Sequence, residues 1–338
     1  MECKKSFVFG QKDKKLEIVR RHLEDSSSYR TIQKRNRLTK NTACKTVNEA
    51  AQTIKDSFWV ARNLKPKWGG ILVFDGTYIR VKNQFAKLAR RLGWYQDERF
   101  LHKMIVLLGV DFHTRDLPHY SLGDNENMID LVMYFQQLKE NGYDTKILVR
   151  DGNQRISKAA EHVYGRPIIT QLCHYHFLSK FDEKIACKEL LAERQFITEL
   201  KNRICSIIYA SDIGLACKRM NDFMVNQNQF RISKTMNELS DKFIRDFEQL
   251  TMYLQYPKGY VPRTSNMVEG MNRQLKGRLR SMCGFESISS AENYIRLWCL
   301  KRRFQKFTDC KKPYQNFNGR APLEIAGCSI SKLDYLKL

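Results

Sequence analysis

The apolar positions of the first 65 residues predict three short helices. Apolar residues recur every three or four positions from Leu16 to Leu23, which is the spacing of a helix with one buried face. Ser28 and Thr39 can each cap a following helix, because a hydroxyl oxygen accepts a hydrogen bond from a free backbone N–H. The second helix is expected over 29–35, and the apolar positions of the third are Ala43, Val47, Ala50 and Ile54.

The turn between the second and third helices is short. It comprises residues 36–39, and this spacing is typical of a helix-turn-helix, whose last helix enters the major groove of DNA. A small three-helix bundle with a solvated basic face would show the same pattern, so both interpretations stay open. In the first interpretation the DNA-binding side chains are Lys34, Arg35, Arg37, Lys40 and Lys45.

From residue 71 onward the pattern changes to that of β-strands alternating with helices. Gly142 marks the end of one helix, because glycine readily adopts the left-handed conformation that follows a helix. The order indicates a mixed α/β fold. The long connection from Asn83 to His102 is interpreted as a small insertion that meets DNA. We expect strands over 71–81, 103–111 and 117–122, a helix over 128–141, a strand over 146–150, a helix over 156–164 and a strand over 167–172.

Residues 180–256 lose the strand pattern and predict helices only. Apolar residues from Ile232 to Leu254 step by 4, 3, 4, 4, 3 and 4, which predicts one long amphipathic helix, and 185–208 behaves similarly. A basic amphipathic helix follows Thr264. The last helix is expected from Ser289 to Phe307, with Ser289 and Glu292 as a capping box.

The length of 338 residues and a hydrophobic content of 42% allow a substantial core and two or three domains. We expect an α/β fold preceded by a helical DNA-binding region. The predicted divisions are a helix-turn-helix region over 1–65, the first part of the core over 66–178, an all-α insertion over 179–260, and the rest of the core with a C-terminal helix over 261–338.

The charge balance favours a polyanionic partner. Lys and Arg number 59 against 36 Asp and Glu, which gives a formal net charge of +23. Such an excess creates a long-range positive field that attracts nucleic acid. An anionic membrane is less favoured, since no basic amphipathic anchor dominates the sequence.

Targeting and redox signals point to a reducing compartment. The sequence has no run of 18 apolar residues, so no transmembrane helix is expected, and residues 1–5 carry no signal-peptide core. The ten cysteines lack paired spacing, which indicates reduced thiols and not a disulfide framework.

Three carboxylates stand in contexts that suggest a catalytic site. Asp75 ends the apolar run 70–75, Asp151 ends the apolar run 146–151, and Glu269 begins the basic helix. Two aspartates on strands and one glutamate on a helix can supply the hard oxygen ligands of two divalent ions. The sequence therefore predicts a two-metal phosphoryl-transfer site.

Each of these residues also has a simpler interpretation. Asp75-Gly76 is a strong hairpin-turn signal between two β-rich runs. The segment from Asp151 to Asn153 could be a turn followed by a helix cap. Glu269 lies three residues after Asn266 and could be its capping-box partner.

The helix that carries Glu269 has two distinct faces. An acidic residue that leads a basic ridge suits a metal site beside a phosphate backbone, although a solvated charged face would look the same. At 100° per residue the apolar face lies about 130° away and would pack on the sheet. The charged face comprises Glu269, Arg273, Lys276 and Arg280, and the apolar face comprises Val268, Met271, Leu275, Leu279 and Met282.

A possible metal motif follows the last predicted core strand. Cys173 and His176 form a C-x-x-H pattern, and His174 offers a third ligand. Zinc is disfavoured, because structural zinc sites need four ligands and only Asp182 and Cys187 lie nearby to complete the set. Cys3 alone does not make a second site.

Taken together, the motifs resemble those of the Mutator-like superfamily of DDE transposases, which includes prokaryotic insertion-sequence enzymes. The resemblance covers about residues 70–310, and a DNA-binding region commonly precedes that part in the family. It rests on Asp75 in Phe-Asp-Gly-Thr-Tyr, Asp151 in Arg-Asp-Gly-Asn, Cys173-x-x-His176, and Thr264-Ser265-Asn266-x-x-Glu269-x-x-Asn272-Arg273-x-x-Lys276.

The resemblance implies an RNase H-like fold with Asp75 on the first strand, Asp151 after the fourth and Glu269 on a late helix. It implies that a helical insertion precedes the glutamate, as expected for 180–256. It also implies that Cys173 and His176 lie near the active site and support DNA handling, and that Lys276 contacts the DNA end. The 83–102 stretch departs from the family pattern.

The function that the resemblance implies is transposition of double-stranded DNA. Two Mg²⁺ ions, for which Mn²⁺ can substitute, would be bound by Asp75, Asp151 and Glu269 during cleavage at the terminal inverted repeats and strand transfer to target DNA. A homodimer or higher synaptic complex is expected, in the cytoplasm with the nucleoid of a prokaryote or in the nucleus of a eukaryote. Two alternatives remain: a non-catalytic DNA-binding regulator, and a structure-specific nuclease on the same fold.

Overall fold

The structure is a computed structural model that describes residues 14–25, 27–82, 101–187, 190–282 and 285–338. The chain divides into two compact units. The first, unit 1, comprises Met1–Gly69, Gly76–Tyr143 and Gly270–Leu338, and unit 2 comprises Gly70–Asp75 and Asp144–Glu269. Each unit is described separately.

A five-stranded mixed sheet forms the centre of the fold, in the order β3-β2-β1-β4-β5. β2 and β3 are antiparallel, whereas β1, β4 and β5 run parallel. The buried apolar runs predicted from the sequence are confirmed as strands, and the mixed sheet is consistent with the RNase H-like fold that the resemblance implied. The strands are β1 (Ile71–Lys82), β2 (Leu101–Asp111), β3 (His119–Gly123), β4 (Ile147–Arg150) and β5 (Ile169–Leu172).

The N-terminal part of unit 1 is helical, as expected. Residues 14–23 form the first helix. α2 (Tyr29–Asn36) is capped by Ser28 and α3 (Lys40–Thr53) by Thr39, which confirms both predicted caps. A further helix, α4 (Ser57–Leu64), was not predicted; Asp56 caps it through a bond from the backbone N–H of Trp59.

The other helices of unit 1 are α6 (Met128–Glu140), α12 (Asn266–Met282, from residue 270 onward), α13 (Ile288–Phe304) and the short α14 (Pro322–Ile325). α13 packs against α3, where the side-chain amide of Asn293 donates to Asn48 at 3.0 Å. The capping box of α13 is formed by Ser287 and Ser290, so the predicted pairing of Ser289 with Glu292 is wrong. Several residue types, serine among them, can occupy the two positions of a capping box, so the spacing of residues alone identified the wrong pair.

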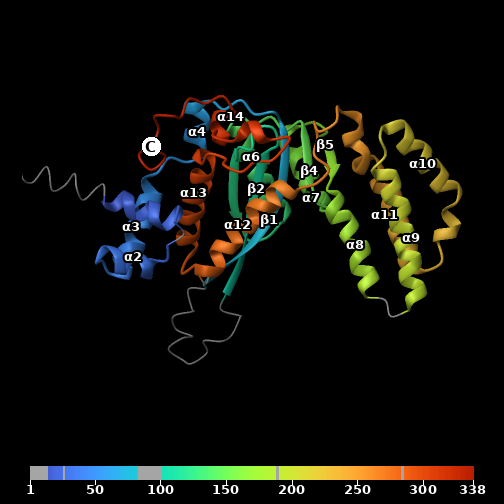
Figure 1. Ribbon diagram of the computed structural model, residues 1–338, viewed down its shortest axis with the longest axis horizontal. Coiled ribbons are helices and arrows are strands. Elements are labelled where there is room, and N and C mark those ends of the chain that lie inside the picture. The colour runs from blue at the N-terminus through green and yellow to red at the C-terminus, as the bar shows by residue number, and fades with distance from the viewer. Residues whose placement is uncertain (1–13, 26, 83–100, 188–189, 283–284) are drawn as a thin grey trace, which may run out of the picture. The chain divides into compact units, whose positions relative to one another are not determined.

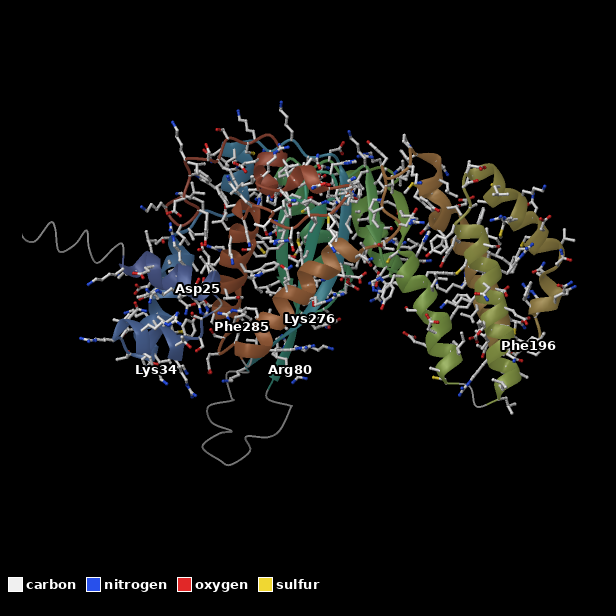
Figure 2. The ribbon with its side chains drawn as sticks, viewed as in Figure 1. Asp25, Lys34, Arg80, Phe196, Lys276 and Phe285 are labelled. Atoms are coloured by element: carbon white, nitrogen blue, oxygen red, sulfur yellow. The ribbon has the colours of Figure 1, made fainter. Side chains whose placement is uncertain are left out.

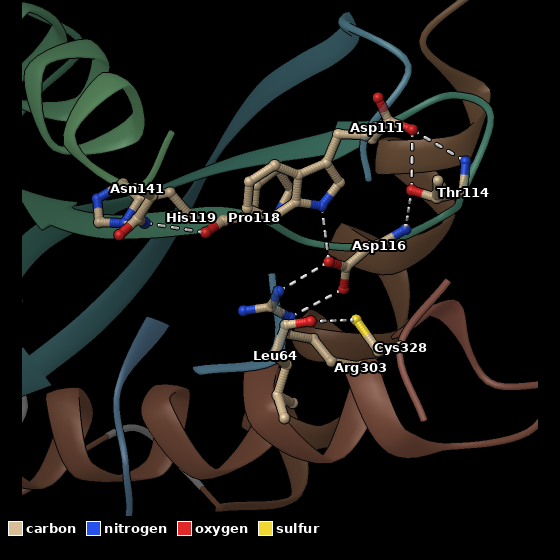
Figure 3. A network of polar contacts seen from close by, with 10 residues as sticks. Leu64, Asp111, Thr114, Asp116, Pro118, His119, Asn141, Arg303 and Cys328 are labelled. Carbon is tan, nitrogen blue, oxygen red and sulfur yellow. Dashed lines mark hydrogen bonds and ion pairs between the residues drawn. The ribbon is translucent and has the colours of Figure 1, made fainter. Parts of the chain in front are cut away.

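A buried ion pair fastens α13 to the loop before β3, as Figure 3 shows. The guanidinium of Arg303 donates to both carboxylate oxygens of Asp116, at 2.8 and 2.7 Å. Both side chains are almost fully buried, and the indole of Trp68 adds a bond to Asp116 at 2.8 Å. Bidentate geometry and this third donor offset much of the cost of desolvating the pair.

Unit 2 joins the parallel strands β4 and β5 to a group of helices (Figure 1). A continuous core of apolar side chains runs from Leu172 on β5 through α8 and α9 to Leu250 on α11. The helices are α7 (Gln154–Tyr164), α8 (His174–Ala186), α9 (Leu191–Ile208), α10 (Ile213–Val225) and α11 (Lys234–Thr251), and the 3-10 helices are η2 (Gln227–Phe230) and η3 (Met252–Gln255).

The helical content predicted for 180–256 is confirmed, with differences in detail. The segment expected to behave as one helix over 185–208 is divided between the end of α8 and α9. α10 was not predicted, and the long helix expected from Ile232 to Leu254 is α11 followed by η3.

In the part of the chain that the structure describes, none of the helices combines the length and the apolar character needed to cross a membrane. The predicted insertion between the first two strands falls mostly at residues 83–100, which lie outside the described residues.

Candidate active site

The register of the parallel strands brings two of the predicted carboxylates side by side. Val73 of β1 pairs with Val149 of β4, and each aspartate follows two residues later. Both carboxylates therefore come from just beyond the same end of this paired region, Asp75 on β1 and Asp151 directly after β4. The separation of neighbouring strands is about 4.8 Å.

The next strand in the sheet, β5, brings a further site residue close to Asp151. Arg150 pairs with Leu172 of β5, and the backbone N–H of Cys173 donates to the carbonyl of Arg150 at 2.8 Å. Cys173 thus lies beside Asp151, on the side away from Asp75. Three of the predicted site residues thus come from neighbouring strands or their ends: Asp75 on β1, Asp151 directly after β4 and Cys173 directly after β5.

β1 continues without a turn through Asp75 and Gly76, so the hairpin-turn interpretation of these residues is wrong. The glycine is explained by packing. A Cβ at position 76 would lie 2.6 Å from Cδ1 of Ile105 and 2.8 Å from Oε1 of Glu126, so the ends of both side chains would have to shift to make room for it. Glycine allows β1 to run close to these side chains while Asp75 stays on the strand.

Asp151 is held by the start of α7, which also confirms the turn-and-cap interpretation of this segment. Oδ1 of Asp151 accepts from the backbone N–H of Asn153 at 2.9 Å. Asn153 in turn caps α7 by accepting from the backbone N–H of Arg155. A local cap and a catalytic role are compatible, because the second oxygen of the Asp151 carboxylate is not used by this bond.

Arg150, immediately before Asp151, is fully buried. Its exposed fraction is 1%. Its guanidinium donates to the backbone carbonyl of Asp151 at 2.6 Å, to Oγ of Ser157 at 2.6 Å and to Oε1 of Gln249 at 3.3 Å. It therefore ties the end of β4 to both α7 and α11. Sequence reasoning missed this role, since a basic residue in an apolar run was its only signal.

Ser265 connects the other three site residues. Its hydroxyl lies 2.5 Å from Oε1 of Glu269, 3.2 Å from Sγ of Cys173 and 3.4 Å from Nδ1 of His176. A hydroxyl has one proton to donate, and the shortest contact indicates that Glu269 accepts it. The sequence did not single out Ser265 beyond its place in the motif, because its partners lie far away in the chain.

Glu269 is in the first turn of α12, as predicted. Its side chain is 19% exposed, and its Oε1 lies 3.7 Å from Nδ1 of His176. The predicted apolar face of the helix is confirmed where the side chains are described, and the side chain of Met282 lies outside that part. Val268, Met271, Leu275 and Leu279 are buried.

Electrostatics couple Cys173 and His176. The hydrogen bond with Cys173, opposed by burial, raises the pKa of His176 to about 9, and the negative charges of Glu269 and Asp75 act in the same direction as that bond. Burial disfavours ionisation of the Cys173 thiol, but hydrogen bonds from His176 and Ser265 outweigh it and lower its pKa. The arrangement favours a thiolate beside an imidazolium.

Cys173, His176 and Glu269 could together hold a metal ion. One ligand atom from each lies within 4.8 Å of the others, and in the described residues no other group of three such side chains meets this condition. Sulfur and imidazole ligands suit zinc better than Mg²⁺. The hydroxyl of Ser265, in contact with all three, explains why they are together without requiring a metal.

The other candidates for such a metal site lie elsewhere. Nε2 of the buried His174 bonds to the carbonyl of Leu250 at 2.7 Å, so this ring faces α11. Asp182 pairs with Lys201 at 2.5 Å, and Cys187 is exposed. Cys3 lies outside the described residues.

The three carboxylates offer the oxygen ligands that Mg²⁺ prefers. Asp75 lies on β1, and Asp151 directly follows β4. Oε1 of Glu269 lies near Nδ1 of His176, and the negative charge of Asp75 also raises the pKa of His176. The three do not converge within 4.8 Å of one another.

The predicted DNA-binding side chains other than Cys173 and His176 are all exposed. Figure 2 labels Lys276 on α12 and Lys34 on α2. Cys173, by contrast, is only 1% exposed. The exposed set is Arg273, Lys276 and Arg280 on α12, with Lys34, Arg35, Arg37, Lys40 and Lys45 on α2, α3 and the turn between them.

Comparison with known proteins identifies a family. No curated protein matches the chain. Residues 36–305 match the family described as "Transposase, Mutator family", which is most of the 338-residue sequence. The matched range includes all three carboxylates, the Cys173 and His176 pair and the α12 helix. The chain therefore belongs to the Mutator family of transposases.

Proposed function

We propose that this protein cuts DNA at the ends of a mobile element and joins those ends to target DNA, with Asp75, Asp151 and Glu269 as the catalytic carboxylates. The observation that supports the proposal is the strand register, in which Val73 pairs with Val149 and each aspartate follows two residues later. Family membership implies transposition, and the proposal adds the residues and the chemistry.

Two Mg²⁺ ions are the cofactor that this donor set fits, and Mn²⁺ can substitute. When bound by Asp75, Asp151 and Glu269, they would lower the pKa of an attacking hydroxyl and stabilise charge on the oxygens at phosphorus. The cofactor assignment rests on the oxygen chemistry of these three side chains.

The reaction consists of two in-line displacements at phosphorus. In the first, water attacks the phosphodiester at the element end, and a 3′-oxygen leaves and takes up a proton. In the second, that 3′-OH loses its proton and attacks a target phosphodiester, from which another 3′-oxygen leaves. Neither step forms a covalent bond to the protein, so the main task of the side chains is positioning and charge stabilisation.

The surrounding residues hold the carboxylates in place. Ser265 orients Glu269 by its 2.5 Å hydrogen bond, and Asn153 fixes one oxygen of Asp151. His176 is cationic at neutral pH and 33% exposed in its side chain, so it can attract a phosphate. Cys173 is buried and acts through His176 instead of touching DNA.

DNA is held by basic side chains outside the carboxylate group. Arg273, Lys276 and Arg280 follow Glu269 on the same face of α12. The exposed cations of α2 and α3 would read the terminal inverted repeat in the manner of a helix-turn-helix. Two element ends must be joined in one event, so we propose a dimer or a higher synaptic complex.

The decisive test compares the natural protein with Glu269→Gln in Mg²⁺-dependent cleavage and strand transfer. The substrates are duplexes carrying the repeat ends that flank the gene. Activity in the natural protein and its loss in the variant would support the proposal. Binding without cleavage in either Mg²⁺ or Mn²⁺ would favour the regulator, and cleavage of branched or hybrid substrates without these ends would favour the nuclease.

A further inference from the structure

A cavity of about 350 Å³ lies within unit 1, between α12, α13 and the segment that follows α13. Its size falls at the lower end of the range for small-ligand sites, about 300–1,000 Å³. Its lining combines three aromatic rings with four basic side chains and one carboxylate. These are Tyr294, Trp298 and Phe307, then Arg278, Lys301, Arg302 and Lys306, and Asp309.

Two of these cations lack a carboxylate partner. Among the described residues, neither Lys301 nor Arg302 takes part in an ion pair, and Nε of Arg302 has no hydrogen-bond partner. Both are partly buried, and this burial lowers the pKa of each. A charge removed from water without compensation is costly, so the site favours an anion that supplies the missing partner.

The aromatic residues suit a flat ring. Trp298 and Phe307 line the same cavity, and the guanidinium of Arg302 lies 5.9 Å from the centre of the Phe307 ring. A nucleobase stacks on such rings regardless of its identity, and each stacked base contributes about 1–3 kcal/mol to binding. The amides of Gln274 and Gln305 also line the cavity and can bond to the edge of a base.

A purely structural role accounts for only part of this arrangement. Arg278 donates to the carbonyls of His22 and Ser27, and Lys301 donates to the carbonyl of Leu23 at 2.9 Å. These bonds attach the first helix and its following loop to α12 and α13. They satisfy donors but do not neutralise charge. The carboxylate that lines the cavity near Arg302 is that of Asp309, which is exposed and, among the described residues, forms no ion pair with Arg302.

We propose that this cavity binds one nucleotide, with its base against Trp298 and Phe307 and its phosphate beside Lys301 and Arg302. The exposed Lys306 at the rim adds a further cation for the phosphate. In a DNA-binding protein the natural source is a nucleotide that is unpaired in the duplex and turned out of its stack. A free mononucleotide offers the same chemistry. The proposal that the nucleotide belongs to DNA rests on the proposed function, whereas the proposal that the cavity binds a nucleotide does not.

The first experiment is photo-crosslinking of the full chain carrying Asp75→Asn, so that DNA is bound but not consumed. The probes are a duplex with one unpaired 5-iododeoxyuridine, the same duplex with that base paired to adenine, and free 5-iododeoxyuridine monophosphate. We expect the unpaired duplex to label Trp298, Phe307 or Tyr294, and the paired duplex to label them far less. If only the free nucleotide labels these residues, the cavity binds nucleotides as proposed, and its ligand is a mononucleotide. Crosslinks only at other residues with all three probes would overturn the proposal.

The second experiment measures affinity. Arg302→Gln and Lys306→Gln are each expected to weaken binding of the unpaired duplex about tenfold, as loss of a charged hydrogen bond predicts, with a smaller effect on the paired duplex. Arg62→Gln removes an exposed charge of unit 1 outside the cavity and serves as the matched control. Equal weakening of both duplexes by Arg302→Gln and Arg62→Gln would contradict a nucleotide site. Because the readout is binding, failure of cleavage would leave this result interpretable.

Discussion

Asp75 and Asp151 each lie two residues beyond a pair of residues in register on the neighbouring parallel strands β1 and β4. The pairing of Val73 with Val149 fixes this relationship, since both aspartates lie two residues further on. Apolar strands lead directly to both carboxylates: Asp75 lies on β1, and Asp151 is the first residue after β4, where the start of α7 holds its carboxylate. Such a rigid origin suits a site whose ligands must be placed before the ions and DNA arrive.

Replacing Asp75 with Asn should abolish cleavage and leave DNA binding nearly intact. We expect the cleavage rate to fall by more than about 100-fold, because losing a group that only supports a metal ligand already costs 10–100-fold. The rate and the DNA affinity are measured side by side. Asp222→Asn, on the exposed surface of α10, is the control. Equal loss of binding and cleavage in the Asp75 variant would rule out the assignment.

Replacing Arg150 with Gln should affect both stability and catalysis. The change leaves the carbonyl of Asp151 and Oγ of Ser157 without their donor, which costs about 1–3 kcal/mol of unfolding free energy. We also expect a lower kcat with little change in KM, because Asp151 loses the support of its own backbone. Urea unfolding and cleavage kinetics provide the readouts.

The matched control for that variant is Arg155→Gln, an exposed arginine on α7 close by in the chain. If both variants lose the same stability and keep the same kcat, Arg150 has no positioning role.

Much of the fold could be predicted because the local pattern and the tertiary environment agree. The strands that lead to Asp75 and Asp151 were recognisable because each contains a run of apolar residues that the sheet buries on both faces. The caps of α2 and α3 were recognisable for a similar reason, since Ser28 and Thr39 act on backbone groups only three residues away. Signals of this kind need no knowledge of distant contacts.

The missed features depend on contacts between distant residues or on weak patterns. Ser265 contacts Cys173 across 92 positions of the chain, and Arg150 reaches Gln249 across 99. No spacing rule links such pairs. The predicted capping box at Ser289 failed because several serines near the start of α13 fit the same local pattern.

The coupling of Cys173 with His176 predicts an unusual histidine titration. In the folded protein His176 should stay protonated until the pH approaches about 9, whereas a free histidine titrates near 6.5. In Cys173→Ser the largest cause of this shift is weakened, so the pKa should fall toward the ordinary value. NMR of isotope-labelled histidine side chains measures both. An unchanged His176 titration in the variant would show that Cys173 is not the cause.

The same pair makes a prediction about stability and pH. The raised pKa of His176 gives stability that is fully present below about pH 6.5 and is lost as the pH rises through about 9. The lowered pKa of Cys173 gives stability that is present above the ordinary thiol value of 9.0 and is lost as the pH falls through the lowered value. The two slopes oppose each other in the natural protein. The largest cause that raises the pKa of His176 is Cys173, and the largest cause that lowers the pKa of Cys173 is His176, so Cys173→Ala and His176→Ala should each weaken both slopes. Unfolding free energies of the natural protein and of both variants, measured between about pH 6 and about pH 10, test this. The same dependence on pH in all three proteins would contradict the coupling.

Replacing Lys276 with Gln should weaken DNA binding through the phosphate backbone. Loss of one phosphate contact lowers the slope of log affinity against log salt by about 0.9, since one fewer counterion is released. The effect should be the same for element ends and unrelated duplexes, because phosphate contacts carry no base information. Lys332→Gln, also exposed and in unit 1, should leave the slope unchanged. A change of affinity confined to element ends would instead mean that Lys276 reads bases, and an unchanged slope would remove it from the DNA interface.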